Sequence, residues 1–312
     1  MSEDLARLRL AASLVRAGKL VAFPTETVYG LGANALDADA VARIFAVKGR
    51  PFTSPVIVHV DSIDMARKLA AVWPDSAETL AARFWPGPLT LVLPRGPEVP
   101  DIVTAGLPTV GLRMPAHPLA LALIREAGVP VAAPSANRFT EVSPTTAAHV
   151  SSSLGDAVDL ILDGGPSAVG IESTVVSLAA GRPLLLRPGM ISRETIEALI
   201  GPVELVAAVP GAHPSPGMHP RHYSPRTALY LVDGGVIPEA GRGAYLWHST
   251  PAPAARAIAM PAEAAAYGAM LYRILHELDE QGWDWIAVEA PPQDLEWTAI
   301  ADRLHRAATG RL

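Results

Sequence analysis

One segment of this 312-residue chain is unsuited to a regular helix or strand, and it divides the chain in two. Residues 207–226 read AAVPGAHPSPGMHPRHYSPR, with proline, glycine, serine and histidine crowded together and no apolar period. Proline removes a backbone donor and glycine loosens the backbone, so this composition is typical of a linker. The length suits about two domains. The sequence therefore predicts domains at 1–206 and 227–312, with 207–226 as the linker.

Strand-like and helix-like segments alternate on both sides of the linker. Short apolar runs such as VIVHV (56–60) and LTLVL (89–93) favour strands, whereas residues 5–17 have apolar side chains at helical spacing. This alternation predicts an α/β protein, and the frequent short strands in tandem favour a mixed sheet over a purely parallel one. A smaller second α/β unit is expected beyond the linker. It has strand-like runs at 228–232, 243–247, 257–260 and 285–290, a long helix at 261–280 and a final helix at 296–308.

Composition narrows the class of protein. Half of the residues are hydrophobic and 18% are charged, which supplies a sizeable core. There is no cysteine, so neither a disulfide nor a cysteine metal site can form, and this fits a reducing compartment. The net charge of −6 argues against a general nucleic-acid binder. The sequence shows no secretory signal and no apolar run of membrane-spanning length, so we expect a cytoplasmic protein without a membrane partner.

The chemistry-bearing residues lie in polar clusters at the ends of predicted strands. No P-loop, dinucleotide fingerprint, serine-hydrolase elbow or zinc-protease motif is present. The clusters instead are PTETVYGLGAN (24–34), KGRP (48–51), TVGLRMP (109–115), APSANRFTEVSP (133–144), EST (172–174) and LLRPG (185–189). Together they predict one polar pocket with several cations and many hydroxyls, but without an obvious nucleophile and base.

Several of these clusters also have a simpler interpretation. Lys48 and Arg50 together suit a polyphosphate, because lysine is a compact point charge and arginine grips two oxygens, but cations also stabilise a helix C-terminus. Arg113, at the end of an apolar strand, needs either a carboxylate ligand or an internal Asp or Glu. Residues 24–34 could form an ordinary strand-to-helix turn, and Ser143 could be a helix N-cap. A lone histidine in an apolar strand, such as His59, is more often a satisfied core residue.

Several motifs in one order connect the chain to a known family. The runs FPTETVYGLGANA, KGRP with SPVIVHV, FWPGPLTLVL, VGLRMPAHP, PVAAPSAN, ESTVVSL and LLRPG resemble the Sua5/YrdC/YciO family over about residues 10–200. The tail, introduced by SPGMHPRHYSP, resembles the extra C-terminal domain of the longer Sua5 branch. The resemblance implies a twisted mixed α/β sheet, the YrdC-like domain, followed by a small Rossmann-like domain.

The resemblance also implies an activity, since members of the Sua5 type are L-threonylcarbamoyladenylate synthases. They condense L-threonine, bicarbonate and ATP, release pyrophosphate, and supply the N6-threonylcarbamoyladenosine (t6A) modification of adenosine 37 in tRNA. The implied residues around threonine and bicarbonate are Thr25, His59, Arg113, Ala133 and Ser173. The implied ATP-binding residues are Lys48, Arg50, Thr53, Thr109, Ser135, Asn137, Ser143, Arg187 and Tyr223. Of these, Lys48 and Arg50 are the catalytic candidates, and Tyr223 in the linker is expected to close over the nucleotide.

The expected cofactor is Mg²⁺, carried on the ATP phosphates without protein side-chain ligands. The expected partners are the three substrates and a downstream t6A transferase machinery, with at most a weak tRNA contact. Two alternatives stay open. A structured-RNA-binding module is disfavoured by the acidic net charge. A different carbamoyl transfer, as in hydrogenase-maturation carbamoyltransferases, is disfavoured because their zinc-finger-like regions need cysteines that this chain lacks.

Overall fold

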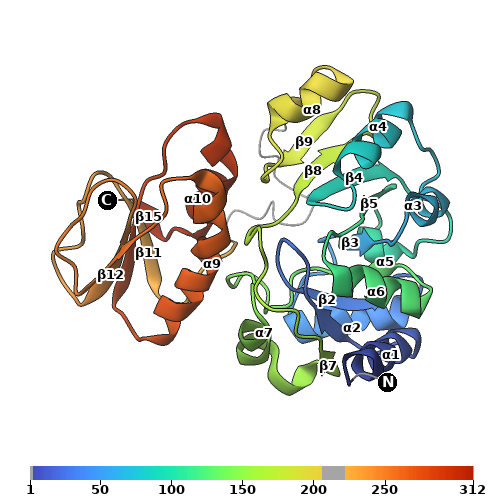
Figure 1. Ribbon diagram of the computed structural model, residues 1–312, viewed down its shortest axis with the longest axis horizontal. Helices are drawn as coiled ribbons and strands as arrows, with labels where there is room; N and C mark the ends of the chain where they lie inside the picture. The colour runs from blue at the N-terminus through green and yellow to red at the C-terminus, as the bar shows by residue number, and fades with distance from the viewer. Residues whose placement is uncertain (1–2, 206–221, 312) are drawn as a thin grey trace.

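The computed structural model describes residues 3–205 and 222–311, which form two domains lying side by side (Figure 1). Positions 207–221 of the predicted linker lie outside the described residues. Only its last positions, 222–226, belong to the described part, and they lead directly into the second domain.

The first domain is built on one ten-stranded sheet. Its strands are β1 (Val21–Phe23), β2 (Gly30–Asn34), β3 (Ile57–His59), β4 (Leu89–Pro94), β5 (Thr109–Arg113), β6 (Val131–Ala132), β7 (Leu160–Ile161), β8 (Thr174–Ser177), β9 (Leu184–Arg187) and β10 (Glu204–Leu205). The spatial order is β10-β9-β8-β4-β5-β3-β6-β2-β1-β7. Strand β3 runs parallel to β5, but β4 runs antiparallel to β5, so the predicted mixed sheet is confirmed.

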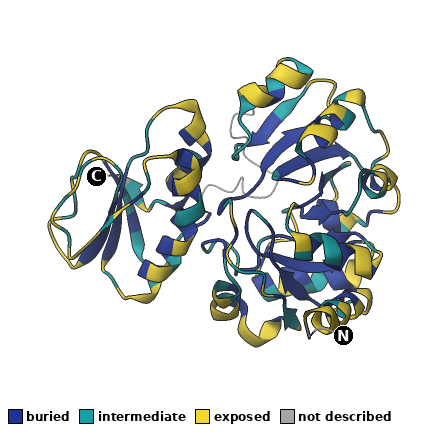
Figure 2. Cartoon of the chain, viewed as in Figure 1, coloured by how far each residue is buried: buried dark blue, intermediate teal, exposed yellow. Residues whose placement is uncertain are grey.

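Helices cover this sheet and bury their apolar faces on it. They are α1 (Glu3–Arg16), α2 (Ala38–Lys48), α3 (Ile63–Leu69), α4 (Asp75–Phe84), α5 (Asp101–Thr104), α6 (Pro118–Ala127), α7 (Ala147–Leu154) and α8 (Arg193–Ile200), with a short 3₁₀ turn at Gly155–Ala157. Figure 2 shows buried strands surrounded by helices whose outer faces are exposed. Helices α1 and α6 pack over Phe23 and Val131, while α2 and α4 line the larger core.

The ends of α2 position the KGRP cluster. Asp37 caps the N-terminus as expected, because its carboxylate accepts hydrogen bonds from the amides of Asp39 and Ala40. Gly49 adopts φ 63° and ends the helix, a conformation that favours glycine. Lys48 therefore occupies the last turn of α2, and Arg50 follows the glycine.

Strand β2 is an element that the sequence patterns did not predict, because residues 24–34 indicated a polar site cluster or a strand-to-helix turn. The segment pairs with β1 on one side and β6 on the other. Gly32 fits there because a Cβ atom would lie 2.8 Å from both the Phe23 ring and the Val131 side chain. Close packing thus selects glycine in a strand, against its ordinary propensity.

The second domain has a five-stranded sheet of order β13-β12-β14-β11-β15, in which every recorded pair is parallel. Its strands are β11 (Ala228–Val232), β12 (Gly243–Trp247), β13 (Arg256–Ala259), β14 (Trp285–Glu289) and β15 (Gly310–Arg311). Its helices are α9 (Ala264–Glu280) and α10 (Thr298–Ala307), with a 3₁₀ turn at Leu295–Trp297. The expected small Rossmann-like unit is confirmed as a parallel α/β domain.

The two domains share an apolar core cluster. Val28, Val142 and Ile171 of the first domain belong to the same buried cluster as Tyr272 of α9 and Ile300 of α10. Figure 1 shows both helices on the side of the second domain that faces the first. Across the described ranges, no helix combines the length and the apolar character needed to cross a membrane.

Candidate active site

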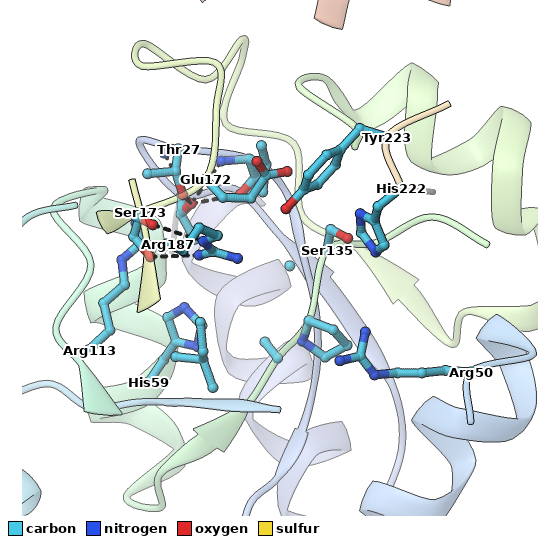
Figure 3. Close-up of a pocket in the computed structure, with 16 residues that line it drawn as sticks. Thr27, Arg50, His59, Arg113, Ser135, Glu172, Ser173, Arg187, His222 and Tyr223 are labelled. Carbon is cyan, nitrogen blue, oxygen red and sulfur yellow. Dashed lines mark hydrogen bonds between the residues drawn. The ribbon is translucent and has the colours of Figure 1, made fainter. Parts of the chain in front are cut away.

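The ends of the central strands surround a cleft of about 540 Å³, a volume that includes its open mouth. Figure 3 shows the lining side chains converging on it. The predicted site residues that line it are Thr25, Arg50, His59, Arg113, Ala133, Ser135, Ser173, Arg187 and Tyr223. His59, Arg113 and Arg187 are the last residues of β3, β5 and β9. Their positions follow from the sheet order, which places strands far apart in sequence beside one another.

Arg113 has an internal carboxylate partner. Its Nη2 atom lies 2.7 Å from Oε1 of Glu26. The other carboxylate oxygen of Glu26, Oε2, accepts a hydrogen bond from the Ala116 amide. The guanidinium and carboxylate atoms are close without being aligned as a hydrogen bond. Arg113 also donates from Nε to the Gly87 carbonyl. Of the two partners considered from sequence, the internal acid is the one present, and a ligand carboxylate would have to share the guanidinium with it.

His59 is buried but not satisfied. Its ring meets Phe23 edge to face at a centroid distance of 5.9 Å, and its Nδ1 atom has no hydrogen-bond partner in the described part of the chain. Burial, reinforced by the Arg113 cation, lowers the pKa of His59 to about 3. The imidazole is therefore neutral at ordinary pH and borders the cleft, unlike a satisfied core histidine.

Lys48 and Arg50 occupy different environments. Arg50 lines the cleft, and its Nη2 atom donates to Ser54 Oγ at 2.6 Å and to the Pro55 carbonyl at 2.8 Å. Lys48 lies behind the wall, where its Nζ atom donates to the Ser135 carbonyl at 2.7 Å and the Asn137 carbonyl at 2.5 Å. Burial lowers the pKa of the Lys48 ammonium, and the neighbouring Arg50 lowers it further.

Arg187 and Ser173 form the third cationic part of the cleft. Arg187 donates from Nε to the Ser173 carbonyl and from Nη2 to the Ser173 hydroxyl, at 3.0 and 3.1 Å. Burial lowers the pKa of both Arg187 and Arg50, the latter to about 10. Desolvated guanidiniums so near each other favour an anion in the cleft.

The other predicted residues do not border the cleft. Thr53 is exposed, and Thr109 borders a separate small hollow beside Thr90 and Val175. Asn137 is buried and donates from Nδ2 to the Glu141 carbonyl. Ser143 is also buried, and its hydroxyl donates to Glu172 at 2.6 Å.

The alternative role of Ser143 as a helix N-cap is wrong. Helix α7 begins at Ala147, and Thr146 is its N-cap. The Ser143 hydroxyl instead donates a hydrogen bond to the Glu172 carboxylate in the cleft wall.

Several lining residues were absent from the predicted set, namely Thr27, Val28, Gly30, Ile57, Pro134, Glu172 and His222. Thr27 and Glu172 stand in polar clusters that the sequence did single out, and His222 directly precedes Tyr223. Burial lowers the pKa of His222 to about 3. Proximity to the predicted residues was thus the available signal for these three. Val28, Gly30 and Pro134 carried the same signal, because they stand in the clusters at 24–34 and 133–144, whereas Ile57 in an apolar strand carried none.

The cleft offers no cage for a metal ion. No group of three or more His, Asp or Glu side chains with metal-binding geometry occurs in residues 3–205 and 222–311. The Mg²⁺ implied by the resemblance stays a prediction.

Comparison with known proteins places this architecture in a family. Residues 13–189 match the Sua5–YciO–YrdC family model, described as "Telomere recombination", and residues 191–309 match the model described as "Threonylcarbamoyl-AMP synthase, C-terminal domain". The chain is 43% identical to the threonylcarbamoyl-AMP synthase of Bacillus subtilis, over 100% of this chain and 96% of that protein.

Solved structures agree with the sequence comparison. The crystal structure of Pyrococcus abyssi Sua5 complexed with L-threonine superposes with a TM-score of 0.91 at 40% identity, covering 100% of this chain and 97% of that chain. A structure of full-length HypF in a phosphate- and nucleotide-bound form matches with a TM-score of 0.52 at 25% identity, over 58% of this chain and 28% of that chain. Since both matched models and the near-complete coverage agree, this chain belongs to the Sua5–YciO–YrdC family, in the branch with the threonylcarbamoyl-AMP synthase C-terminal domain.

Proposed function

We propose that this chain is a threonylcarbamoyl-AMP synthase, a nucleotidyltransferase that condenses L-threonine, bicarbonate and ATP and releases pyrophosphate. One observation carries the proposal. Three buried guanidiniums, those of Arg50, Arg113 and Arg187, meet in one strand-end cleft of a chain similar along its whole length to enzymes of that name. Such a cleft suits a substrate pair that carries a carboxylate and a triphosphate.

L-threonine occupies the Arg113 side of the cleft in this proposal. The Arg113 guanidinium binds the carboxylate, and its imperfect alignment with Glu26 leaves donor capacity for a second acid. The neutral His59 ring, the Thr25 and Ser173 hydroxyls and the Ala133 backbone surround the rest of the amino acid. The threonine complex of the similar P. abyssi protein supports this choice of substrate.

ATP occupies the rest of the cleft, from Arg187, which adjoins the threonine subsite through Ser173, to Arg50. Arg50 and Arg187 contact the phosphates directly, with Ser135 beside them, and Tyr223 covers the nucleotide. Lys48, Asn137 and Ser143 support the cleft wall from behind. Thr53 and Thr109 reach the nucleotide only after a local movement. Mg²⁺ binds through phosphate oxygens and water.

The chemistry requires two bonds to form. The neutral threonine amine attacks the carbon of bicarbonate or carbon dioxide and gives a carbamate. Water leaves if bicarbonate reacts, and the amine loses a proton to solvent if carbon dioxide reacts. A carbamate oxygen then attacks the α-phosphorus of ATP, and the bond from that phosphorus to the bridging oxygen breaks to release pyrophosphate. Positioning and charge neutralisation by fixed cations can supply most of the acceleration, without a covalent enzyme intermediate.

Substrate dependence tests the proposal. Purified protein incubated with ATP and Mg²⁺ should form threonylcarbamoyl-AMP and pyrophosphate only when L-threonine and bicarbonate are both present. Serine in place of threonine is the matched control and should give far less product. If ATP is consumed equally with serine, or without bicarbonate, the proposed substrates are wrong.

The product has a place in a longer reaction sequence under this proposal. It is an activated carbamate, so a separate cytoplasmic transferase must carry its threonylcarbamoyl group to N6 of adenosine 37 in tRNA. The tRNA itself then contacts this protein weakly or not at all.

A further inference from the structure

A carboxylate in the cleft wall is held by side chains from both domains. Glu172 accepts the Ser143 hydroxyl at Oε1. Its Oε2 atom accepts Nε of Arg303 at 2.8 Å and the Tyr272 hydroxyl at 3.1 Å. Tyr272 belongs to α9 and Arg303 to α10, so two of this carboxylate's three side-chain partners come from the second domain. The Arg303 side chain is only 1% exposed and does not line the cleft.

The charge of Glu172 matters to the cleft because Arg187 lies near it. Burial alone would raise the pKa of the Glu172 carboxyl, but Arg303 and then Arg187 overcome burial and hold the pKa below its usual value. An ionised Glu172 without Arg303 would have Arg187 as its principal cation. It would then compete with phosphate for that guanidinium and repel a triphosphate.

Arg303 also supports the residue that covers the cleft. Its guanidinium carbon lies 5.3 Å from the centroid of the Tyr223 ring, and Tyr223 stacks on Tyr272 at 5.9 Å. Tyr223 has φ 62°, an uncommon conformation for a bulky residue that the surrounding contacts must maintain. Figure 3 shows the Tyr223 hydroxyl pointing into the cleft.

We propose that Arg303 is a positioning residue of the ATP subsite, through which the docked second domain sets the affinity of the cleft for a triphosphate. It neutralises Glu172 from outside the cleft, which leaves Arg187 available to an anionic ligand, and it supports the Tyr223 ring. The inference rests on the proposed function for the identity of the anion.

Four variants of the full-length chain test the role of charge. Arg303→Met should weaken binding of a non-hydrolysable ATP analogue, measured by calorimetry with Mg²⁺, by roughly tenfold or more. Arg303→Lys keeps the charge and should lose much less. Glu172→Gln combined with Arg303→Met removes both charges and should regain most of the affinity. Arg306→Met is the matched control, because Arg306 lies on the same helix and pairs with Asp302 at 2.9 Å.

A merely structural role for Arg303 predicts a different pattern. Loss of packing would lower the melting temperature and raise KM for ATP and for threonine in parallel, whereas the proposed role raises KM for ATP selectively. If Arg303→Met binds the analogue as tightly as wild type, or if the double variant binds no better than Arg303→Met, the inference is wrong. Should Arg303→Met fail to fold, the double variant and Arg303→Lys are compared with wild type instead. Each must keep most of the wild-type affinity, and a tenfold loss in either contradicts the inference.

The direct binding measurement keeps this inference separate from the proposed function. If wild type binds the analogue and the variants follow the expected order but no threonylcarbamoyl-AMP forms, the proposed function fails and Arg303 keeps its role. If wild type makes the product and the variants do not follow the order, only the role of Arg303 fails.

Discussion

At the scale of single residues, the two cations of the KGRP motif have different surroundings. Lys48 and Arg50 are two positions apart, yet only Arg50 borders the cleft. The Lys48 ammonium is enclosed by the carbonyls of Ser135 and Asn137 and by the Asn137 side-chain oxygen. It thus fixes the loop that presents Ser135 to the cleft.

We predict that Lys48→Arg impairs turnover although it preserves the charge. The ammonium fits a site that is 3% exposed and bounded by backbone oxygens, and the wider guanidinium fork would displace the loop. A small misplacement of this kind should lower kcat by roughly tenfold or more. Steady-state assays of product formation measure this, with exposed Lys68→Arg as the matched control. A fully active Lys48→Arg enzyme would contradict this explanation of the lysine.

The Tyr223 hydroxyl gives a second prediction at this scale. It is buried without a hydrogen-bond partner in the described residues, although it points into the cleft. Tyr223→Phe should therefore leave the free energy of unfolding unchanged or slightly higher, because no internal hydrogen bond is lost. The same variant should bind the ATP analogue several-fold more weakly. Chemical denaturation and calorimetry separate the two effects, and an unaltered affinity would exclude a role for the hydroxyl in nucleotide binding.

At the scale of elements, the positions of most strands along the chain were predictable, but the order of the strands in the sheet was not. The apolar runs at 89–93 and 228–232 became β4 and β11 nearly residue for residue, because a short apolar run is a local signal. β2 was missed because its glycines are selected by contact with Phe23 and Val131, which are distant in sequence. The order of ten strands likewise depends on long-range packing that periodicity does not record.

The same limit applies to the site. Thr25, Arg113 and Ser173 could be named because each stands in a motif that resembles the family. That Arg113 pairs with Glu26 and not only with a ligand depends on how two loops meet. The sequence offered both partners for this arginine and no means of choosing between them.

We predict that Gly32→Ala destabilises the first domain by about 1–3 kcal/mol, the range typical of overpacking. The added methyl would lie 2.8 Å from Phe23 and from Val131, both fully buried and unable to withdraw freely. Gly111→Ala is the matched strand control, since its Cβ would meet nothing nearer than Thr90 at 3.4 Å. Urea unfolding compares the two variants. Equal stability of both would show that β2 can relax.

At the scale of the whole molecule, the second domain is part of the site architecture. Arg303 of the second domain pairs with Glu172 of the first, although the two are 131 positions apart in sequence. His149 of α7 stacks on His276 of α9 across the same interface between the domains, with ring centroids 4.0 Å apart. Burial lowers the pKa of His149 to about 4, and the pKa of His276 is lowered as well. Neutral histidines thus lie both in the cleft and between the domains.

Acid should therefore destabilise the whole molecule well above the range in which carboxylates titrate. His59 and His222 have folded pKa values of about 3 against 6.5 when unfolded, so below pH 6.5 the unfolded chain binds protons that the folded chain does not. The free energy of unfolding then falls as the pH falls, and each histidine contributes a loss of about 2 kcal/mol between pH 7 and pH 5.

Equilibrium unfolding in urea at pH 7 and pH 5 measures this loss, and one substitution assigns it. His222 packs edge to face between Phe139 and Tyr223, and its Nδ1 atom has no partner in the described chain, so a phenyl ring can take its place without leaving a polar group unsatisfied. His222→Phe should keep the stability measured at pH 7 and reduce the loss at pH 5 by about 2 kcal/mol. If His222→Phe loses as much stability on acidification as wild type, His222 already gains its proton in the folded state, and the low pKa attributed to its burial is wrong.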